Sequence, residues 1–225
     1  MIVPESLLFK LPKHFSFEEG SLLEPLVIGV HTAKTASLSI ADSVVVLGAG
    51  PIGLAMAAAA RQAGVRELFI TAKYAVQREA ATAIGIKPEN ILGIEPEEVT
   101  REILQRTENG GVDCVCVGVG KRGKTTELGM SIIAKGGRIV IAAPSYDPIA
   151  LDPQQLIPKE IKIMGSHAFG VWNRVHEWEL ALKLMQNGLY PADKIVTHKF
   201  SIDNINDAFK VKMKEGESIK VMIVF

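Results

Sequence analysis

The chain has 225 residues, with 25 lysines and arginines against 25 aspartates and glutamates, so its formal net charge at pH 7 is +0. This balance provides no overall field that favours nucleic acid or a membrane surface, and the length is sufficient to bury a large core. The most apolar run, residues 54–60, is too short to cross a bilayer. Residues 1–15 contain prolines and charges where a signal peptide needs an apolar segment, so we expect a cytoplasmic protein.

Strand-like and helix-like segments alternate through the middle of the chain. The predicted strands are residues 43–48, 67–71, 90–94, 112–118, 138–144 and 160–166. The predicted helices are residues 51–64, 75–85, 96–107 and 123–137. The first, fourth and fifth strands are almost continuously apolar, which is typical of strands covered on both faces. The pattern predicts an α/β fold, a Rossmann doubly wound parallel sheet of six strands.

The two flanks differ from this middle part, and we divide the chain at residues 1–40, 41–165 and 166–225. The first part is a loop followed by a helix over residues 21–36. The last part is predicted to hold a helix (172–188), a strand (194–200), a helix (202–216) and a final strand (219–225). The final strand is so apolar that it needs a partner strand and a covering layer. We expect the apolar runs at residues 22–30 and 219–225 to be exposed and to cause self-association.

A glycine turn, Gly48-x-Gly50-x-x-Gly53, lies between the first predicted strand and its helix. In this context the first glycine permits the tight turn, the second lets a pyrophosphate approach the backbone, and the third allows close helix–strand packing. Pro51 suits the first helical turn, and with Ile52 it completes a helix N-terminus whose free N–H groups face the phosphates. The alternative is a tight turn with no ligand. The context favours a dinucleotide site.

The end of the second predicted strand bears on which dinucleotide binds. An NAD site usually has an acidic residue there to bind the ribose 2′-OH, but this chain has Ala72, followed by Lys73 and Tyr74, with Arg78 further on. Lys73 and Arg78 could pair with a 2′-phosphate, and Tyr74 could lie beside the adenine or donate its hydroxyl. The two cations could also be solvated surface charges. The missing acid favours NADP(H) over NAD(H).

The remaining reactive side chains are weaker candidates. Cys114 and Cys116 share one face of a predicted strand, so we expect two buried thiols in a reducing compartment. We interpret the pair His176–Glu177 as a surface feature of an amphipathic helix. A basic cluster follows the fourth strand; it could contact cofactor phosphates, but a solvated loop is expected: Lys121, Arg122 and Lys124. The other histidines lack metal-ligand spacing and are expected to be surface or packing residues: His14, His31, His167 and His198.

Several segments in this order resemble the zinc-dependent medium-chain dehydrogenases, in particular the sorbitol and threonine dehydrogenase branch. They are "LPKHFSFEEGSLLEPL", "ADSVVVLGAGPIGLAMAAAARQAGV", "GGVDCVCVGVG", "AKGGRIVIAAP" and "IVTHKFSIDNINDAFKVKMKEGESIKVMIVF". The resemblance covers nearly the whole chain. The segment "TAKY" is similar to that of NADP-using ketose reductases, which agrees with the charge argument. Members of the family carry an N-terminal GroES-like catalytic domain, and this sequence lacks most of it, including the Gly-His-Glu zinc motif and the cysteine lobe.

The resemblance implies site residues and partners. Glu24 matches a position that reaches the catalytic zinc in the sorbitol-type branch, although it could equally be a helix-start carboxylate, and alone it cannot hold a metal. We expect no catalytic residue in this chain. Dimerisation in the family uses the sixth strand, here residues 160–166, so a homo-oligomer is expected. The nicotinamide end is expected to lie against Val117, Gly118, Val119, Ala142, Ala143, Ala168 and Phe169.

Three hypotheses for function follow. The chain could be the cofactor-binding portion of an NADP(H)-dependent alcohol or polyol dehydrogenase, which transfers hydride between nicotinamide and an alcohol or ketone. It could be one subunit of a split dehydrogenase whose zinc domain is another polypeptide. It could instead be a nucleotide-binding module without catalysis. The final strand favours the first two, because it suits a catalytic domain.

Overall fold

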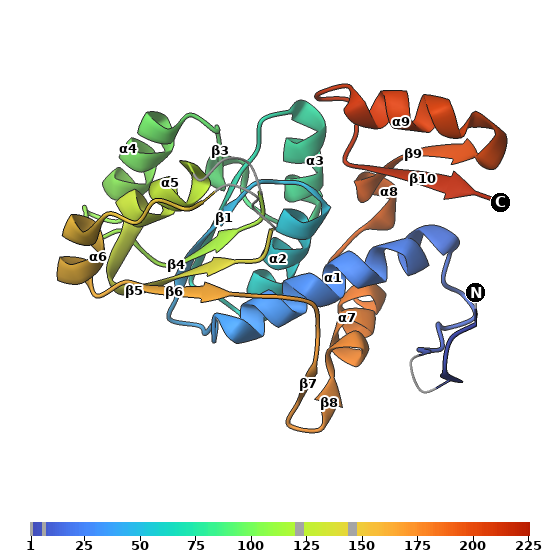
Figure 1. Ribbon diagram of the computed structural model, residues 1–225, viewed down its shortest axis with the longest axis horizontal. Coiled ribbons are helices and arrows are strands. Elements are labelled where there is room, and N and C mark those ends of the chain that lie inside the picture. Colours follow the sequence, from blue (N-terminus) through green and yellow to red (C-terminus); the bar gives the residue numbers. More distant parts are fainter. Residues whose placement is uncertain (1, 6–7, 120–123, 144–147) are drawn as a thin grey trace.

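The computed structural model describes residues 2–5, 8–119, 124–143 and 148–225 (Figure 1). Its α-helices are α1 (Phe17–Thr35), α2 (Pro51–Gln62), α3 (Ala75–Ala83), α4 (Pro96–Arg106), α5 (Lys124–Ile132), α6 (Pro153–Lys159), α7 (Glu177–Gln186), α8 (Ala192–Ile195) and α9 (Ile205–Met213). Its strands are β1 (Ser43–Leu47), β2 (Glu67–Thr71), β3 (Ile91–Leu92), β4 (Val112–Val117), β5 (Ile133–Ile141), β6 (Lys162–Gly165), β7 (Val171–Trp172), β8 (Val175–His176), β9 (Val196–Ser201) and β10 (Lys220–Val224). Short 3₁₀ turns cover Pro88–Asn90 and Ile202–Asn204.

Six strands form one sheet in the order β3-β2-β1-β4-β5-β6, and all neighbours in it are parallel. The chain therefore starts in the middle of the sheet, builds one half, and returns to build the other. This is the Rossmann strand order, and it confirms the predicted α/β fold. The order reverses between β1 and β4, and a ligand of such a sheet binds at the carboxyl ends of these two strands.

Two separate apolar cores cover the two faces of the sheet. Residues of α1, α2, α3 and α7 pack with Val44, Val46, Cys114 and Cys116 on one face. Residues of α4, α5 and α6 pack with the alternate positions of the same strands on the other face. Strands with both faces covered must be apolar throughout, which explains the unbroken pattern Val44–Leu47 in β1.

The helix α1 starts at a capping box, in which Ser16 Oγ accepts the Glu19 N–H and the Glu19 carboxylate accepts the Ser16 N–H. It packs closely on α2 at Gly29, where a Cβ would lie only 2.4 Å from the carbonyl carbon of Ala55. Its apolar residues, including Leu22 and Leu26, are buried between α2 and α7. The expected exposed surface at residues 22–30 is therefore wrong, since helices of this same chain cover it.

The predicted helix over residues 172–188 is wrong in its first part. Residues Val171–His176 form the hairpin β7–β8, which turns through Asn173 and Arg174 with φ values of 50° and 66°. Two positive φ values are typical of a type I′ turn, and helix α7 starts only after it, at Glu177. A second difference lies in β5, which begins at Ile133, because a bulge with Gly136 at φ +75° replaces the end of the predicted helix.

The final strand β10 pairs in parallel with β9, and these two strands form a small sheet apart from the six-stranded one. The predicted need for a partner strand is met in this way. Ile219 is buried, but Val224 and Phe225 remain exposed, so only the end of the expected apolar surface at residues 219–225 is present. Among the described residues, none of the helices has both the length and the apolar character that crossing a membrane requires.

Candidate nucleotide-binding site

The glycine turn joins β1 to α2 at the reversal point of the sheet. Gly48 has φ +103°, and its N–H donates to Thr71 Oγ1 at 2.8 Å, which ties the turn to the end of β2. A Cβ on Gly53 would lie 1.8 Å from the Gly48 carbonyl oxygen, so this position accepts only glycine. A Cβ on Gly50 would meet nothing within 4 Å. The open space beside Gly50 is the space that a pyrophosphate needs in order to approach the backbone.

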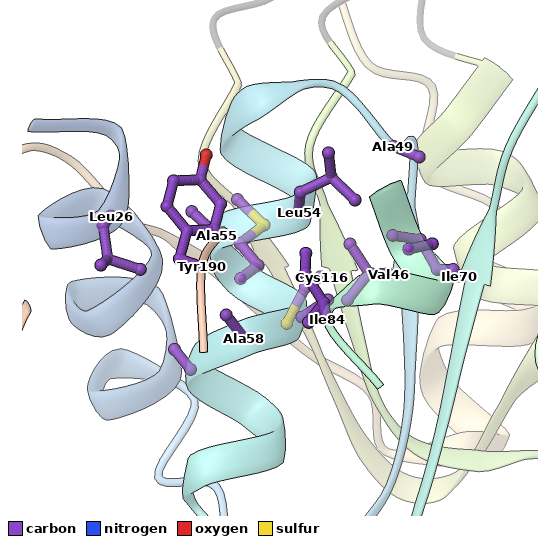
Figure 2. Close-up of a cluster of buried hydrophobic side chains, with 14 of the residues drawn as sticks. Leu26, Val46, Ala49, Leu54, Ala55, Ala58, Ile70, Ile84, Cys116 and Tyr190 are labelled. Carbon is purple, nitrogen blue, oxygen red and sulfur yellow. The ribbon is translucent and has the colours of Figure 1, made fainter. Parts of the chain in front are cut away.

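Helix α2 begins at Pro51, with Gly50 as its N-cap, as the sequence predicted. The N–H groups of Ile52 and Gly53 belong to the first turn, where no intrahelical acceptor exists, so they remain available to an anion. Tyr190 is buried, and its hydroxyl donates a hydrogen bond to the Pro51 carbonyl at 2.6 Å, which anchors the first turn of α2. Figure 2 shows its ring between α1 and α2, near Leu26 and Ala55. Burial, together with the charge of Glu24, raises the pKa of Tyr190, which keeps the hydroxyl a donor.

The end of β2 places Ala72 inside the fold and Lys73 at the surface. Lys73 Nζ lies 2.7 Å from Glu215 Oε2, and the Tyr74 hydroxyl donates to the same oxygen at 2.5 Å. Lys73 Nζ also lies 4.9 Å from the centre of the Tyr74 ring. The hydrogen bond to Glu215, and then the one to Tyr74, raise the pKa of Lys73. Lys73, one of the two cations predicted to pair with a 2′-phosphate, therefore lies beside the predicted hydroxyl donor Tyr74, and the Glu215 carboxylate contacts both side chains.

Arg78 lies one turn further along α3. Its guanidinium donates to the Ile91 carbonyl at 2.8 Å, at the start of β3. Arg78 remains exposed, and this contact engages one of its guanidinium nitrogens with the backbone. Of the basic cluster predicted after β4, Lys121 and Arg122 lie outside the described residues, and Lys124 begins α5.

The carboxyl end of β4 lies against the glycine turn, and the end of β5 lies beside β4. The Gly118 N–H donates to the Leu47 carbonyl at 3.0 Å, and a Cβ on Gly48 would lie 2.0 Å from Val119 Cγ2. Ala142 and Ala143 both direct their N–H groups at the Val117 carbonyl, at 3.2 and 3.3 Å. The structure thus brings together the five residues that the resemblance assigned to these two strand ends: Val117, Gly118, Val119, Ala142 and Ala143.

Ala168 and Phe169 follow β6. Ala168 has φ +61°, a conformation that costs a residue with a side chain about 1 kcal/mol or more and that is common at functional sites. The Phe169 ring meets Trp178 edge-on, with 5.1 Å between ring centres, and remains 42% exposed. The next N–H, that of Gly170, donates to Glu177 Oε2 at 2.6 Å, which anchors this segment.

The interpretation of His176–Glu177 as a surface pair is wrong. Glu177 has no exposed surface, and its carboxylate contacts both the Gly170 N–H and His31 Nδ1, at 2.6 and 2.9 Å. His176 is only partly exposed, and its Nδ1 is buried without a hydrogen-bond partner. The hairpin β7–β8 causes the difference, since it turns the start of α7 toward α1 and places Glu177 inside.

The described residues do not fit a catalytic zinc ion. Among them, no group of three His, Cys, Asp or Glu side chains could hold a metal. Glu24 is exposed on α1 and provides a single carboxylate, whereas a zinc site needs three or four ligands. Cys114 and Cys116 are free, buried thiols, as predicted. Their hydrogen bond and their burial raise the pKa of Cys116 well above its ordinary value, which opposes metal binding by a thiolate.

The comparisons with known proteins agree with this geometry. A family model described as "Zinc-binding dehydrogenase" matches residues 51–187, which is more than half of the chain. The chain belongs to the zinc-binding dehydrogenase family. The resemblance drawn from the sequence motifs is thereby confirmed. The chain spans about 60% of the length of the curated zinc-type relatives that it matches.

Relatives of the chain include proteins named as dehydrogenases of sorbitol and of butanediol. The chain is 29% identical to the sorbitol dehydrogenase of Bos taurus over 220 residues, which are 96% of this chain and 58% of the relative. The crystal structure of 2R,3R-butanediol dehydrogenase from Bacillus subtilis matches with a TM-score of 0.83 and 28% identity, covering 98% of this chain and 61% of that one. A protein from Sinorhizobium meliloti 1021, described as a zinc-binding dehydrogenase bound to NADP, shares the fold with a TM-score of 0.83 and 24% identity, over 99% of this chain and 64% of its own.

Proposed function

We propose that this chain is the cofactor-binding portion of an NADP(H)-dependent alcohol or polyol dehydrogenase. The observation that supports it most strongly is the glycine turn. In this turn Gly53 packs so closely on the Gly48 carbonyl that no side chain fits there. The space beside Gly50 is open, and helix α2 begins at Pro51. The first turn of α2 would bind the cofactor pyrophosphate through backbone N–H groups. Polyol dehydrogenases among the relatives support the substrate class.

The proposed preference for NADP(H) rests on the end of β2. Ala72 has no carboxylate that would repel a 2′-phosphate, while Lys73 and Tyr74 offer a cation and a hydroxyl donor side by side. Arg78 is near enough in sequence to add a second cation, but its bond to Ile91 makes its contribution the smaller one.

The nicotinamide ring would lie at the carboxyl ends of β4, β5 and β6. Backbone around Val117–Val119 and Ala142–Ala143 would position the ring, and the segment at Ala168 and Phe169 would close its outer side. A bound nicotinamide supplies or accepts the hydride, and the protein holds its reacting face toward the substrate. Because the described residues do not fit a zinc ion, we assign no proton transfer or Lewis-acid role to this chain's side chains.

The domain division is part of the proposal. Residues 41–165 would form the dinucleotide-binding domain, while 1–40 and 166–225 would belong with a catalytic domain, which agrees with the separate β9–β10 sheet. Self-association would use β6, which lies at the edge of the six-stranded sheet. A split-enzyme subunit and a module without catalysis remain alternative predictions.

Titration of the 225-residue chain with NADPH and with NADH, followed by nicotinamide fluorescence, tests the proposal. We expect both nucleotides to bind and NADPH to bind more tightly. Tighter binding of NADH would contradict the NADP(H) preference. Binding of neither nucleotide would contradict the function as a whole.

A further inference from the structure

Glu215 occupies the place where a 2′-phosphate would meet the chain. One of its oxygens, Oε2, is within hydrogen-bond distance of both Lys73 Nζ, at 2.7 Å, and the Tyr74 hydroxyl, at 2.5 Å. The contact joins the end of β2 to the loop between α9 and β10, 142 residues later in the chain. Sequence analysis of the site found Lys73 and Tyr74 but not Glu215, because nothing in the local pattern indicates so distant a contact.

The loop around Glu215 is held in place by further contacts. Gly216 has φ +85°, and a Cβ there would lie 2.9 Å from Tyr74 Cδ1, so the glycine backbone packs directly on the tyrosine ring. Lys212 Nζ donates to the Ile219 carbonyl at 2.8 Å. The backbone that carries Glu215 is therefore held against the Tyr74 ring, within reach of Lys73.

A carboxylate and a phosphate bind the same kinds of side chain. Both are anions that accept hydrogen bonds from an ammonium group and a hydroxyl. The phosphate carries about two negative charges near pH 7. It cannot share Lys73 and Tyr74 with Glu215 without repulsion, so Glu215 must withdraw when the phosphate binds. A ribose 2′-hydroxyl has no charge and creates no such conflict, because a carboxylate can accept its hydrogen bond.

We propose that Glu215 is a specificity-determining residue, whose carboxylate competes with the cofactor 2′-phosphate for Lys73 and Tyr74 and so limits the preference for NADP(H) over NAD(H). This inference rests on the proposed function, in which Lys73 and Tyr74 bind the phosphate. It adds that the binding of NADP(H) displaces the Glu215 carboxylate from Lys73 and Tyr74, whereas the binding of NAD(H) leaves this contact in place.

The test compares Glu215→Gln with Glu217→Gln in the full chain. Both variants remove one carboxylate from the same exposed loop, but Glu217 pairs with Lys214 and not with the end of β2. NADPH and NADH are titrated by fluorescence, and 2′-AMP and 5′-AMP are used to displace bound NADPH. Circular dichroism confirms that each variant is folded.

We expect Glu215→Gln to bind NADPH and 2′-AMP about fivefold more tightly, a factor that matches the weak net strength of exposed ion pairs. Its affinities for NADH and 5′-AMP should stay within about twofold of the wild type, and Glu217→Gln should change none of the four. Equal tightening in both variants, or no tightening in Glu215→Gln, overturns the competition while the dinucleotide site stands. If the wild type binds neither nucleotide, the proposed function fails first, and this inference fails with it.

Discussion

His31 Nδ1 lies 2.9 Å from Oε2 of Glu177, a carboxylate with no exposed surface, although 146 residues separate the two along the chain. The same oxygen accepts the Gly170 N–H at 2.6 Å. Through these contacts α1 holds the start of α7 and the segment that follows β6. This segment contains Ala168 and Phe169, two residues proposed to border the nicotinamide.

Glu177→Ala should strongly destabilise the protein. It leaves the Gly170 N–H without its acceptor and His31 without its carboxylate partner, and losing a buried hydrogen bond to a charged group costs about 3 kcal/mol. Glu179→Ala, on the exposed side of the same helix, is the matched control and should change stability by less than about 0.5 kcal/mol. Urea unfolding followed by tryptophan fluorescence measures both. Equal effects would show that the buried contact is unimportant.

Two substitutions in the glycine turn are expected to affect different properties: one the stability of the fold, the other the binding of NADPH. Gly53→Ala places a Cβ 1.8 Å from a backbone oxygen and should lower the free energy of unfolding by about 3 kcal/mol. Gly50→Ala adds its Cβ to open space at φ −79°, so the fold should keep its stability. That methyl would project where a pyrophosphate must approach, and NADPH binding should weaken by about tenfold.

Thermal unfolding and nucleotide titration of the two variants separate these effects. Gly50→Ala should melt close to the wild type, and Gly53→Ala well below it. If Gly50→Ala binds NADPH as tightly as the wild type does, the pyrophosphate does not approach the turn at this glycine.

Asp42 should make stability depend on pH at the acidic end. Burial alone would raise the pKa of its carboxyl, but hydrogen bonds from Arg138 at 2.8 Å and from the Ser39 N–H at 2.6 Å outweigh it, so the pKa is lowered. A group with a lowered folded-state pKa stabilises the fold above its unfolded pKa, about 3.9 for Asp, and loses this effect as the pH falls through the folded value.

Asp42→Asn should therefore cost about 2 kcal/mol at pH 7, and the difference from the wild type should shrink as the pH is lowered from 5 to about 2. Urea unfolding at several pH values measures it. Asp207→Asn is the control, because the Asp207–Lys210 pair is exposed. A difference that stays constant with pH would mean that the Asp42 charge does not stabilise the fold.

Much of the fold was predictable because its causes are local. The unbroken apolar pattern of β1 and the glycine turn after it indicated a buried parallel strand that leads into a helix. The hairpin at Val171–His176 was missed because Asn173 and Arg174 are not the Gly-containing pairs that usually mark a type I′ turn. The burial of α1 was missed because its covering surface is provided jointly by α2 and by α7, and how these helices pack together is not visible in the local pattern.

The candidate site likewise contains residues that a local motif predicts and residues that only the tertiary fold brings to it. Gly48, Gly50 and Gly53 follow from one short motif. Tyr190 contacts the glycine turn at Pro51, and Glu215 contacts Lys73 and Tyr74 at the end of β2; both come from the C-terminal part of the chain, and no spacing rule relates them to the site. Tyr190 lies among buried apolar residues, where sequence alone predicts simple packing. Its hydroxyl contact with Pro51 depends on how α2 and the segment after α7 meet.

Replacement of Ala72 tests the central claim most directly. Ala72→Asp restores the carboxylate that NAD sites usually have at the end of β2. The nucleotide affinities of the wild type and of this variant are measured by fluorescence titration with NADPH and NADH, after circular dichroism has confirmed the fold. We predict that the wild type binds NADPH more tightly, and that the variant weakens NADPH by about tenfold and binds NADH at least as well as before. A wild type that prefers NADH, or a variant whose preference for NADPH is unchanged, would contradict the account.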